Sequence, residues 1–161
     1  DRGPVDSEEL VLAGYWSWYW YHGRIYPTEM VRGLDVFALQ PSEYLSASEI
    51  AAAELADQGR VFNPQQQFPV TWPAEPVVAR AYVDQLRRGS SGNVTAATLD
   101  EISGALELAA SRLTATARDA ALAARLSSLA GRLDATSGDA VTVKRKKGLA
   151  ETLQGVAARL Q

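Results

Sequence analysis

The chain has 161 residues, of which 47% are hydrophobic and 22% charged, and its formal net charge is −3. These values are ordinary for a globular protein, and the weak acidity gives no reason to expect nucleic acid as a partner. The absence of cysteine excludes disulfides, thiolate nucleophiles and cysteine-bound zinc. No apolar run approaches the roughly 18 residues that a membrane-spanning helix needs. The first residues, Asp1 to Pro4, do not form a signal peptide, so we expect a mature or processed chain.

Aromatic residues are concentrated in one predicted strand near the N-terminus. The sequence from Tyr15 to Tyr21 reads Tyr-Trp-Ser-Trp-Tyr-Trp-Tyr, and aromatic residues favour strands. A period of two places the tryptophans on one face and the tyrosines with Ser17 on the other. The strand therefore predicts either burial against a neighbouring layer, which we favour, or a stacking surface for a sugar or peptide. The candidate ligand-binding residues are Trp16, Trp18, Tyr19, Trp20 and Tyr21.

Two further strands are predicted after this one. His22-Gly23 is typical of a tight hairpin turn, since glycine adopts positive φ at little cost. Residues 24–29 form the second strand, and Pro27 within it predicts an edge position or a bulge because proline cannot donate to a ladder. Residues 34–39 alternate as a third strand, and residues 9–13 are a weaker candidate for a fourth. The sequence thus predicts a short antiparallel meander.

The middle of the chain predicts two helices around an extended segment. Ser46-Ala47-Ser48-Glu49 matches a capping box, so a helix is expected over residues 47–58 with Gly59 as its stop. Residues 60–75 contain three prolines and three consecutive glutamines, which indicates irregular extended chain. Pro76 suits the first turn of a second helix that runs to about Arg88.

The last seventy residues predict a three-helix bundle. The first helix is expected to open with a capping box at residues 98–101, the second to end near Gly138, and the third to use Asp139 as its N-cap. Each helix carries one apolar stripe that must be buried. The stripes consist of Leu99, Ile102, Leu106, Ala109 and Leu113; of Leu122, Leu126, Leu129 and Leu133; and of Leu149, Leu153, Val156 and Leu160.

A linker divides the chain into parts of opposite charge. Gly89-Ser90-Ser91-Gly92 is flexible by composition, and the net charge is −5 before it and +2 after residue 89. We therefore expect an α+β chain with three parts: the meander over residues 1–40, the helix, extended segment and helix over residues 41–89, and the bundle over residues 90–161.

The stretch from Val11 to Leu39 resembles one repeat of the bacterial LVIVD-repeat proteins. The matching parts are Gly14-Tyr15, Gly23, Ile25-Tyr26 and Gly33-Leu34-Asp35-Val36. The resemblance implies a blade-like β unit and a secreted or cell-surface location in a bacterium, with a non-enzymatic structural or binding role. A β-propeller needs about four to eight blades, and this chain has material for one at most, so another chain or further copies are expected to complete the sheet.

Motifs for catalysis are scarce. The one histidine, His22, lies in a predicted turn and cannot alone build a histidine-based metal site or serve as the base of a recognisable triad. Glu29 and Asp35 beside the aromatic strand suggest the carboxylate pair of a glycosidase, although we favour ordinary strand-end carboxylates. Asn93-Val94-Thr95 matches a glycosylation sequon by a short pattern.

The densest charge cluster is a basic run in the last predicted helix. It allows a patch for an anionic partner such as a cell-wall polymer, lipid headgroups or nucleic acid, although we favour a solvated helix face. The run consists of Lys144, Arg145, Lys146 and Lys147.

The sequence thus predicts a non-enzymatic structural or binding module with no metal or cofactor. It is expected to work outside the cell, with another protein chain or further copies as partners. The alternatives are a carbohydrate-binding module for cell-surface glycan and a self-assembling structural protein.

Overall fold

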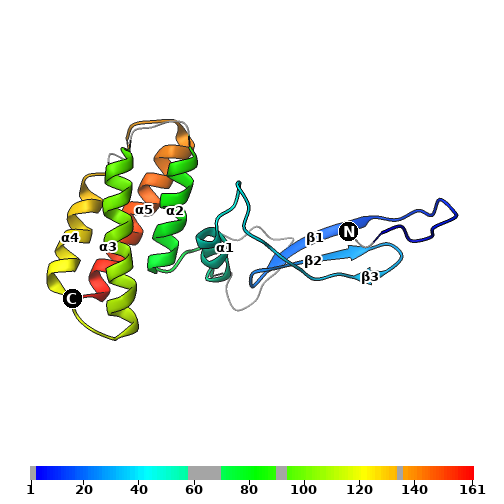
Figure 1. Cartoon of the computed structure of the whole chain (residues 1–161), viewed down its shortest axis with the longest axis horizontal. Coiled ribbons are helices and arrows are strands. Elements are labelled where there is room, and N and C mark those ends of the chain that lie inside the picture. The colour runs from blue at the N-terminus through cyan, green and yellow to red at the C-terminus, as the bar shows by residue number, and fades with distance from the viewer. Residues whose placement is uncertain (1–2, 58–69, 90–93, 134–135) are drawn as a thin grey trace.

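A computed structural model describes residues 3–57, 70–89, 94–133 and 136–161. The molecule is elongated, with a helical bundle at one end and a narrow sheet projecting from the other (Figure 1). We call the projecting part, residues 3–40, the β-arm. A small antiparallel sheet followed by helices confirms the predicted α+β class.

The sheet of the β-arm contains strands β1 (Tyr15–Tyr21), β2 (Arg24–Glu29), β3 (Gly33–Leu34) and β4 (Phe37–Ala38). The bounds of β1 and β2 are those predicted. Both short strands pair antiparallel with β2, which therefore lies in the centre of the sheet. Residues 9–13 form no strand, so the expected fourth strand is wrong.

Pro27 explains why the third strand is split into β3 and β4. The pairs Thr28–Leu34 and Ile25–Phe37 belong to one continuous register, and Pro27 lies between them. The amide of Asp35 donates to the Pro27 carbonyl at 3.1 Å, but proline has no N–H to return the bond. The predicted edge or bulge position was wrong, since Pro27 is buried in the central strand and interrupts the ladder instead.

Helix α1 (Ala47–Glu54) begins with the predicted capping box. The Ser46 hydroxyl accepts from the Glu49 amide at 3.2 Å, and the Glu49 carboxylate accepts from the Ser46 amide at 2.7 Å. The helix ends before the predicted residue 58, and the chain then pairs at Asp57 with Thr71 in an antiparallel bridge. The predicted stop at Gly59, most of the Pro/Gln-rich segment, the Ser90–Gly92 part of the linker and Asn93 lie outside the described residues.

In the part of the chain that the structure describes, four helices rather than the expected three form the bundle. They are α2 (Pro76–Arg88), α3 (Ala96–Thr114), α4 (Ala120–Gly131) and α5 (Ala140–Arg159). Helix α2 buries Ala79 and Val83 in the same core as Leu106 and Leu153. The expected boundary near residue 90 is therefore wrong for α2, because its apolar stripe is covered by α3 and α5. The predicted leucine positions of α3–α5 are buried, apart from the half-buried Leu113.

The ends of these helices test the predicted caps. Asp139 is the N-cap of α5 as expected, since its carboxylate accepts from the Thr142 amide at 2.8 Å. Helix α3 instead starts after Thr95, whose hydroxyl accepts from the Thr98 amide at 3.2 Å. The expected capping box at residues 98–101 therefore lies inside the helix. Helix α4 ends at Gly131, well before the predicted Gly138.

Candidate functional site

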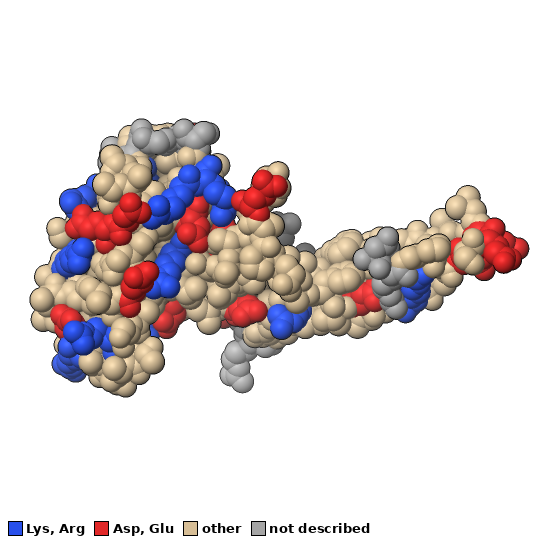
Figure 2. Space-filling view, viewed as in Figure 1, with Lys and Arg blue, Asp and Glu red and all other residues tan. Residues whose placement is uncertain are grey.

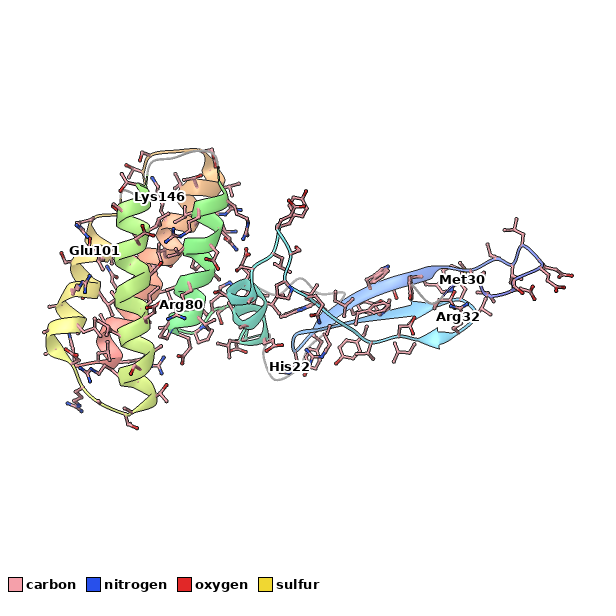
Figure 3. The ribbon with its side chains drawn as sticks, in the orientation of Figure 1. His22, Met30, Arg32, Arg80, Glu101 and Lys146 are labelled. Carbon is pink, nitrogen blue, oxygen red and sulfur yellow. The ribbon has the colours of Figure 1, made fainter. Side chains whose placement is uncertain are left out.

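The turn between β1 and β2 sets the position of the aromatic strand. His22 and Gly23 have φ values of 46° and 72°, the pattern of a type I′ hairpin turn that suits the twist of the flanking strands. Gly23 also lies against α1, because a Cβ atom there would approach Glu54 Cγ to 2.4 Å. Arg24 adds an ion pair to Glu54 at 3.4 Å. His22 is thus the predicted turn residue, and Figure 3 shows it at the end of the β-arm beside α1.

A bulge at the start of β1 changes which rings meet. The register shifts between Tyr15 and Ser17, so the strict alternation expected along the strand fails there. The Tyr15 ring packs against Trp18 with centroids 4.6 Å apart, and Trp18 stacks on Phe37 at 5.9 Å. The prediction that Tyr15 lies on the face opposite the tryptophans is therefore wrong.

The candidate ligand-binding residues differ in how much they face solvent. Trp16 is 74% exposed and Trp18 is 55% exposed, whereas Tyr19 and Trp20 are half-buried. Tyr21 is at the border of exposure and its ring meets His22 edge-on. The predicted burial against a neighbouring layer is therefore absent for Trp16 and Trp18 within the described part of this chain. Contiguous exposed apolar surface marks interaction sites, and these two rings are candidates for part of such a surface.

Strand β1 also forms an edge of the sheet. Because the Asp35 amide bonds to the Pro27 carbonyl, the main-chain groups of Pro27 point toward the third strand. Its partner on β1 is Trp18, and in an antiparallel ladder such a pair makes no bonds across to its partner. The amides and carbonyls of Trp18 and of Trp20, two residues on, therefore point outward from the sheet. Within the described residues no strand lies beyond β1.

The far end of the β-arm is held by the Glu29 carboxylate. One oxygen accepts from the Gly14 amide at 2.9 Å, and the other accepts from the amides of Val31, at 2.8 Å, and Arg32. These hydrogen bonds, the one from Gly14 first, hold the pKa of Glu29 below its usual value. Arg32 in turn donates to the Gly3 and Pro4 carbonyls, which ties the N-terminal segment to the β2–β3 turn.

Neither candidate glycosidase carboxylate is placed like an acid–base residue. Both oxygens of Glu29 are already bonded to main-chain amides, and Asp35 accepts the Tyr15 hydroxyl at 2.7 Å. A general acid needs a raised pKa, whereas that of Glu29 is lowered. A cavity of about 530 Å³ adjoins this end, and it is bordered by residues 3–6, 9–11 and 13–15 with Glu29, Arg32, Asp35 and Phe37.

The basic run of α5 does not form one surface patch. Consecutive helix positions point in different directions, so Lys144 and Lys147 are exposed, Arg145 is half-buried and Lys146 is fully buried. The Lys146 ammonium donates to the Ser137 carbonyl at 2.9 Å and to its hydroxyl at 3.2 Å. Figure 3 places it inside the bundle. Lys146 thus contributes to the α4–α5 connection and cannot reach an anionic partner.

Figure 2 shows how the charges are distributed over one face of the molecule. Acidic side chains gather at the tip of the β-arm, and blue and red side chains alternate over the bundle. Among the described residues, no group of three or more histidine, aspartate or glutamate side chains is arranged to hold a metal ion. No helix in that part of the chain is both long and apolar enough to cross a membrane.

Comparison with known proteins adds no assignment. No protein-family model, curated protein or solved structure matches the chain. The functional interpretation therefore depends on the resemblance of residues 11–39 and on the geometry of the β-arm.

Sequence reasoning did not single out Trp72, which stands apart from the aromatic stretch. It lies between the Asp57–Thr71 bridge and α2, and the residue is 44% exposed. Together with Tyr82 of α2 it borders two cavities. Its signal in the sequence was only that it is the one tryptophan outside residues 16–20.

Proposed function

We propose that the chain is a non-catalytic structural or binding module, the C-terminal piece of a secreted or cell-surface protein similar to the bacterial LVIVD-repeat proteins. In this proposal the β-arm is a blade-like unit that pairs with sheet from another chain or from further repeats. The bundle is the terminal helical part that carries it.

The observation that carries the proposal is the incomplete sheet. An isolated sheet of this size is marginal in water, and an exposed edge strand is a template for pairing with another strand. Strand β1 has seven residues, contains no lysine or proline to block pairing, and directs the main chain of Trp18 and Trp20 outward. The exposed ring of Trp16 lies on the same strand. A partner strand would satisfy the main chain and cover the rings together.

Native mass spectrometry of the particle from its natural source tests the proposal, followed by the masses of its denatured chains. We expect further aromatic repeats, in the same or another chain, and slow hydrogen exchange at the Trp18 and Trp20 amides in the particle. The chain alone should exchange rapidly at both amides. A single 17.4 kDa chain whose two amides exchange rapidly in the native particle would overturn the proposal.

Carbohydrate binding is the second candidate, and the exposure of Trp16 and Trp18 favours it. Aromatic rings stack on the apolar faces of sugars, so cell-wall glycans should change tryptophan emission in a saturable way. Trp16→Ala should abolish the response, and Trp72→Ala should leave it intact. No saturable change with any glycan would reject this candidate.

Self-assembly through the β1 edge is the third candidate. It predicts a mass that rises with protein concentration in sedimentation equilibrium. A lysine at the edge, Trp18→Lys, should restore a monomer because charged edge residues block pairing. A monomer mass for the unmodified chain at every concentration would reject it.

A further inference from the structure

A second aromatic site lies in the helical part, away from the β-arm. Trp72 and Tyr82 both border a cavity of about 100 Å³ with Val78, Ala81 and Ala52, and both border a larger one of about 330 Å³ with Gly148, Glu151 and Thr152. We call the two together the Trp72–Tyr82 cleft. It lies where α1, α2 and α5 meet the segment at residues 71–74.

Gly148 on α5 leaves room for the Tyr82 ring, because glycine has no side chain. A Cβ atom on Gly148 would lie 2.5 Å from Tyr82 Cζ and 2.6 Å from its hydroxyl oxygen. The ring of Tyr82 therefore lies directly against the α5 backbone. Glu151 is three residues further along, on the same side of the helix. Burial first, and the Glu151 charge second, raise the pKa of Tyr82, so the field of that carboxylate reaches the ring.

Most polar groups around the cleft are already engaged. Glu49 is bonded to Arg88 and to the Ser46 amide, and the Thr152 hydroxyl donates to the Gly148 carbonyl at 2.7 Å. The Glu151 side chain is 65% exposed and forms a long ion pair of 3.9 Å with Lys147, whose side chain is more exposed still. The cleft thus offers two aromatic rings, apolar side chains, and the Glu151 carboxylate at its larger cavity, whereas the Glu49 carboxylate at the smaller one is paired with Arg88. A sugar needs several free hydrogen-bonding groups, and at this cleft Glu49 and Thr152 are already bonded within the protein.

We propose that the Trp72–Tyr82 cleft binds a quaternary ammonium group. Such a cation interacts with the faces of tryptophan and tyrosine rings and is further stabilised by a nearby carboxylate. It needs no hydrogen bonds, which suits a cleft whose polar groups are engaged. The cavity of about 330 Å³ is bordered by both rings and by Glu151. An apolar cavity of ~150 Å³ already accommodates a benzene-sized molecule, so this cavity has room for a compact head such as trimethylammonium. This site is independent of the proposed role of the β-arm.

Isothermal titration calorimetry of the whole chain with choline tests the proposal. We expect saturable binding with a Kd of about 1 mM or tighter. The neutral isostere 3,3-dimethyl-1-butanol, which has the same shape without the charge, should bind at least about tenfold more weakly. Vesicles of phosphatidylcholine present the same group on a lipid. Binding to choline but not to vesicles assigns a free solute, and binding to both assigns a lipid headgroup as well.

Variants separate this cleft from other surfaces. Trp72→Ala and Glu151→Gln should each weaken choline binding by about tenfold. Their matched controls, Trp16→Ala in the β-arm and Glu107→Gln on the exposed face of α3, should leave it unchanged. Unaltered far-ultraviolet circular dichroism would show that the variants fold. Absence of saturable choline binding, equal affinity for the neutral isostere, or preference for a neutral disaccharide would each overturn the proposal.

Discussion

At the scale of single residues, Glu29 has the most defined role. Its two oxygens serve different main-chain donors, Gly14 on one side and Val31 with Arg32 on the other. A glutamine has only one acceptor oxygen, so Glu29→Gln must turn its amide group toward one set of N–H donors. We expect this variant to loosen the far end of the β-arm, with faster exchange of the Gly14 or the Val31 and Arg32 amides in nuclear magnetic resonance.

The same residue predicts a pH dependence. Because the pKa of Glu29 is lower in the folded arm than in the unfolded chain, its contribution to stability is complete above the unfolded value of about 4.3. That contribution is lost as the pH falls through the folded value. Tryptophan emission between pH 6 and pH 2 should therefore show an acid transition that Glu29→Gln lacks. Glu8→Gln, in the exposed N-terminal segment, is the matched control and should keep the transition. A transition identical in both variants would contradict this role.

Individual caps and turns were predictable because their physics is local. Ser46 and Asp139 cap their helices as expected, and His22-Gly23 forms the expected turn. The capping box expected at residues 98–101 matched the local pattern, but the helix begins one turn earlier, after Thr95. The bonds of Glu29 and Lys146 depend on segments that only the fold brings together, so no local pattern indicated them.

At the scale of elements, the contact between α2 and α5 depends on glycine. Gly148→Ala should destabilise the bundle by about 1–3 kcal/mol, since the new methyl group would overlap the Tyr82 ring. A Cβ atom on Gly104 in α3 would meet no atom within 4 Å outside its own helix backbone and chain neighbours. Gly104→Ala should therefore stabilise the bundle by about 0.5–1 kcal/mol through helix propensity alone. Urea unfolding followed by circular dichroism measures both, and equal effects of the same sign would show that the α2–α5 contact is not tight.

The strands show where pattern reasoning succeeds and where it stops. The aromatic alternation and the glycine turn located β1 and β2 to the residue, because both signals lie within the hairpin. The consequence of Pro27 depended on whether β2 was central or at an edge, and that is a property of the whole sheet. The bulge that moves Tyr15 onto Trp18 likewise follows from pairing with β2 rather than from the composition of β1.

At the scale of the whole molecule, composition suggested a division at the wrong place. The change in charge near residue 90 separated α2 from the other helices, although its stripe completes their core. The core that α2 helps to form therefore begins before residue 90. The bundle core draws its buried residues from positions 79–160 and none from the β-arm. Amphipathic periodicity identified each helix but did not indicate which helices share a core. An apolar stripe shows that a helix face must be buried, but it does not specify the element that buries it.

The separation of arm and bundle predicts two unfolding transitions. Three of the four tryptophans lie in β1, so fluorescence reports mainly on the β-arm, while circular dichroism at 222 nm reports on the helices. The sheet is small and its largest rings are partly exposed, whereas the bundle core is fully buried.

In a urea titration of the isolated chain, the fluorescence midpoint should therefore lie at lower urea than the helical midpoint. A Trp72→Phe background removes the remaining tryptophan and sharpens the comparison. Coincident midpoints would show that the arm and the bundle unfold as one cooperative unit. Addition of a partner that covers the β1 edge should move only the fluorescence midpoint upward, because binding stabilises the part that it contacts.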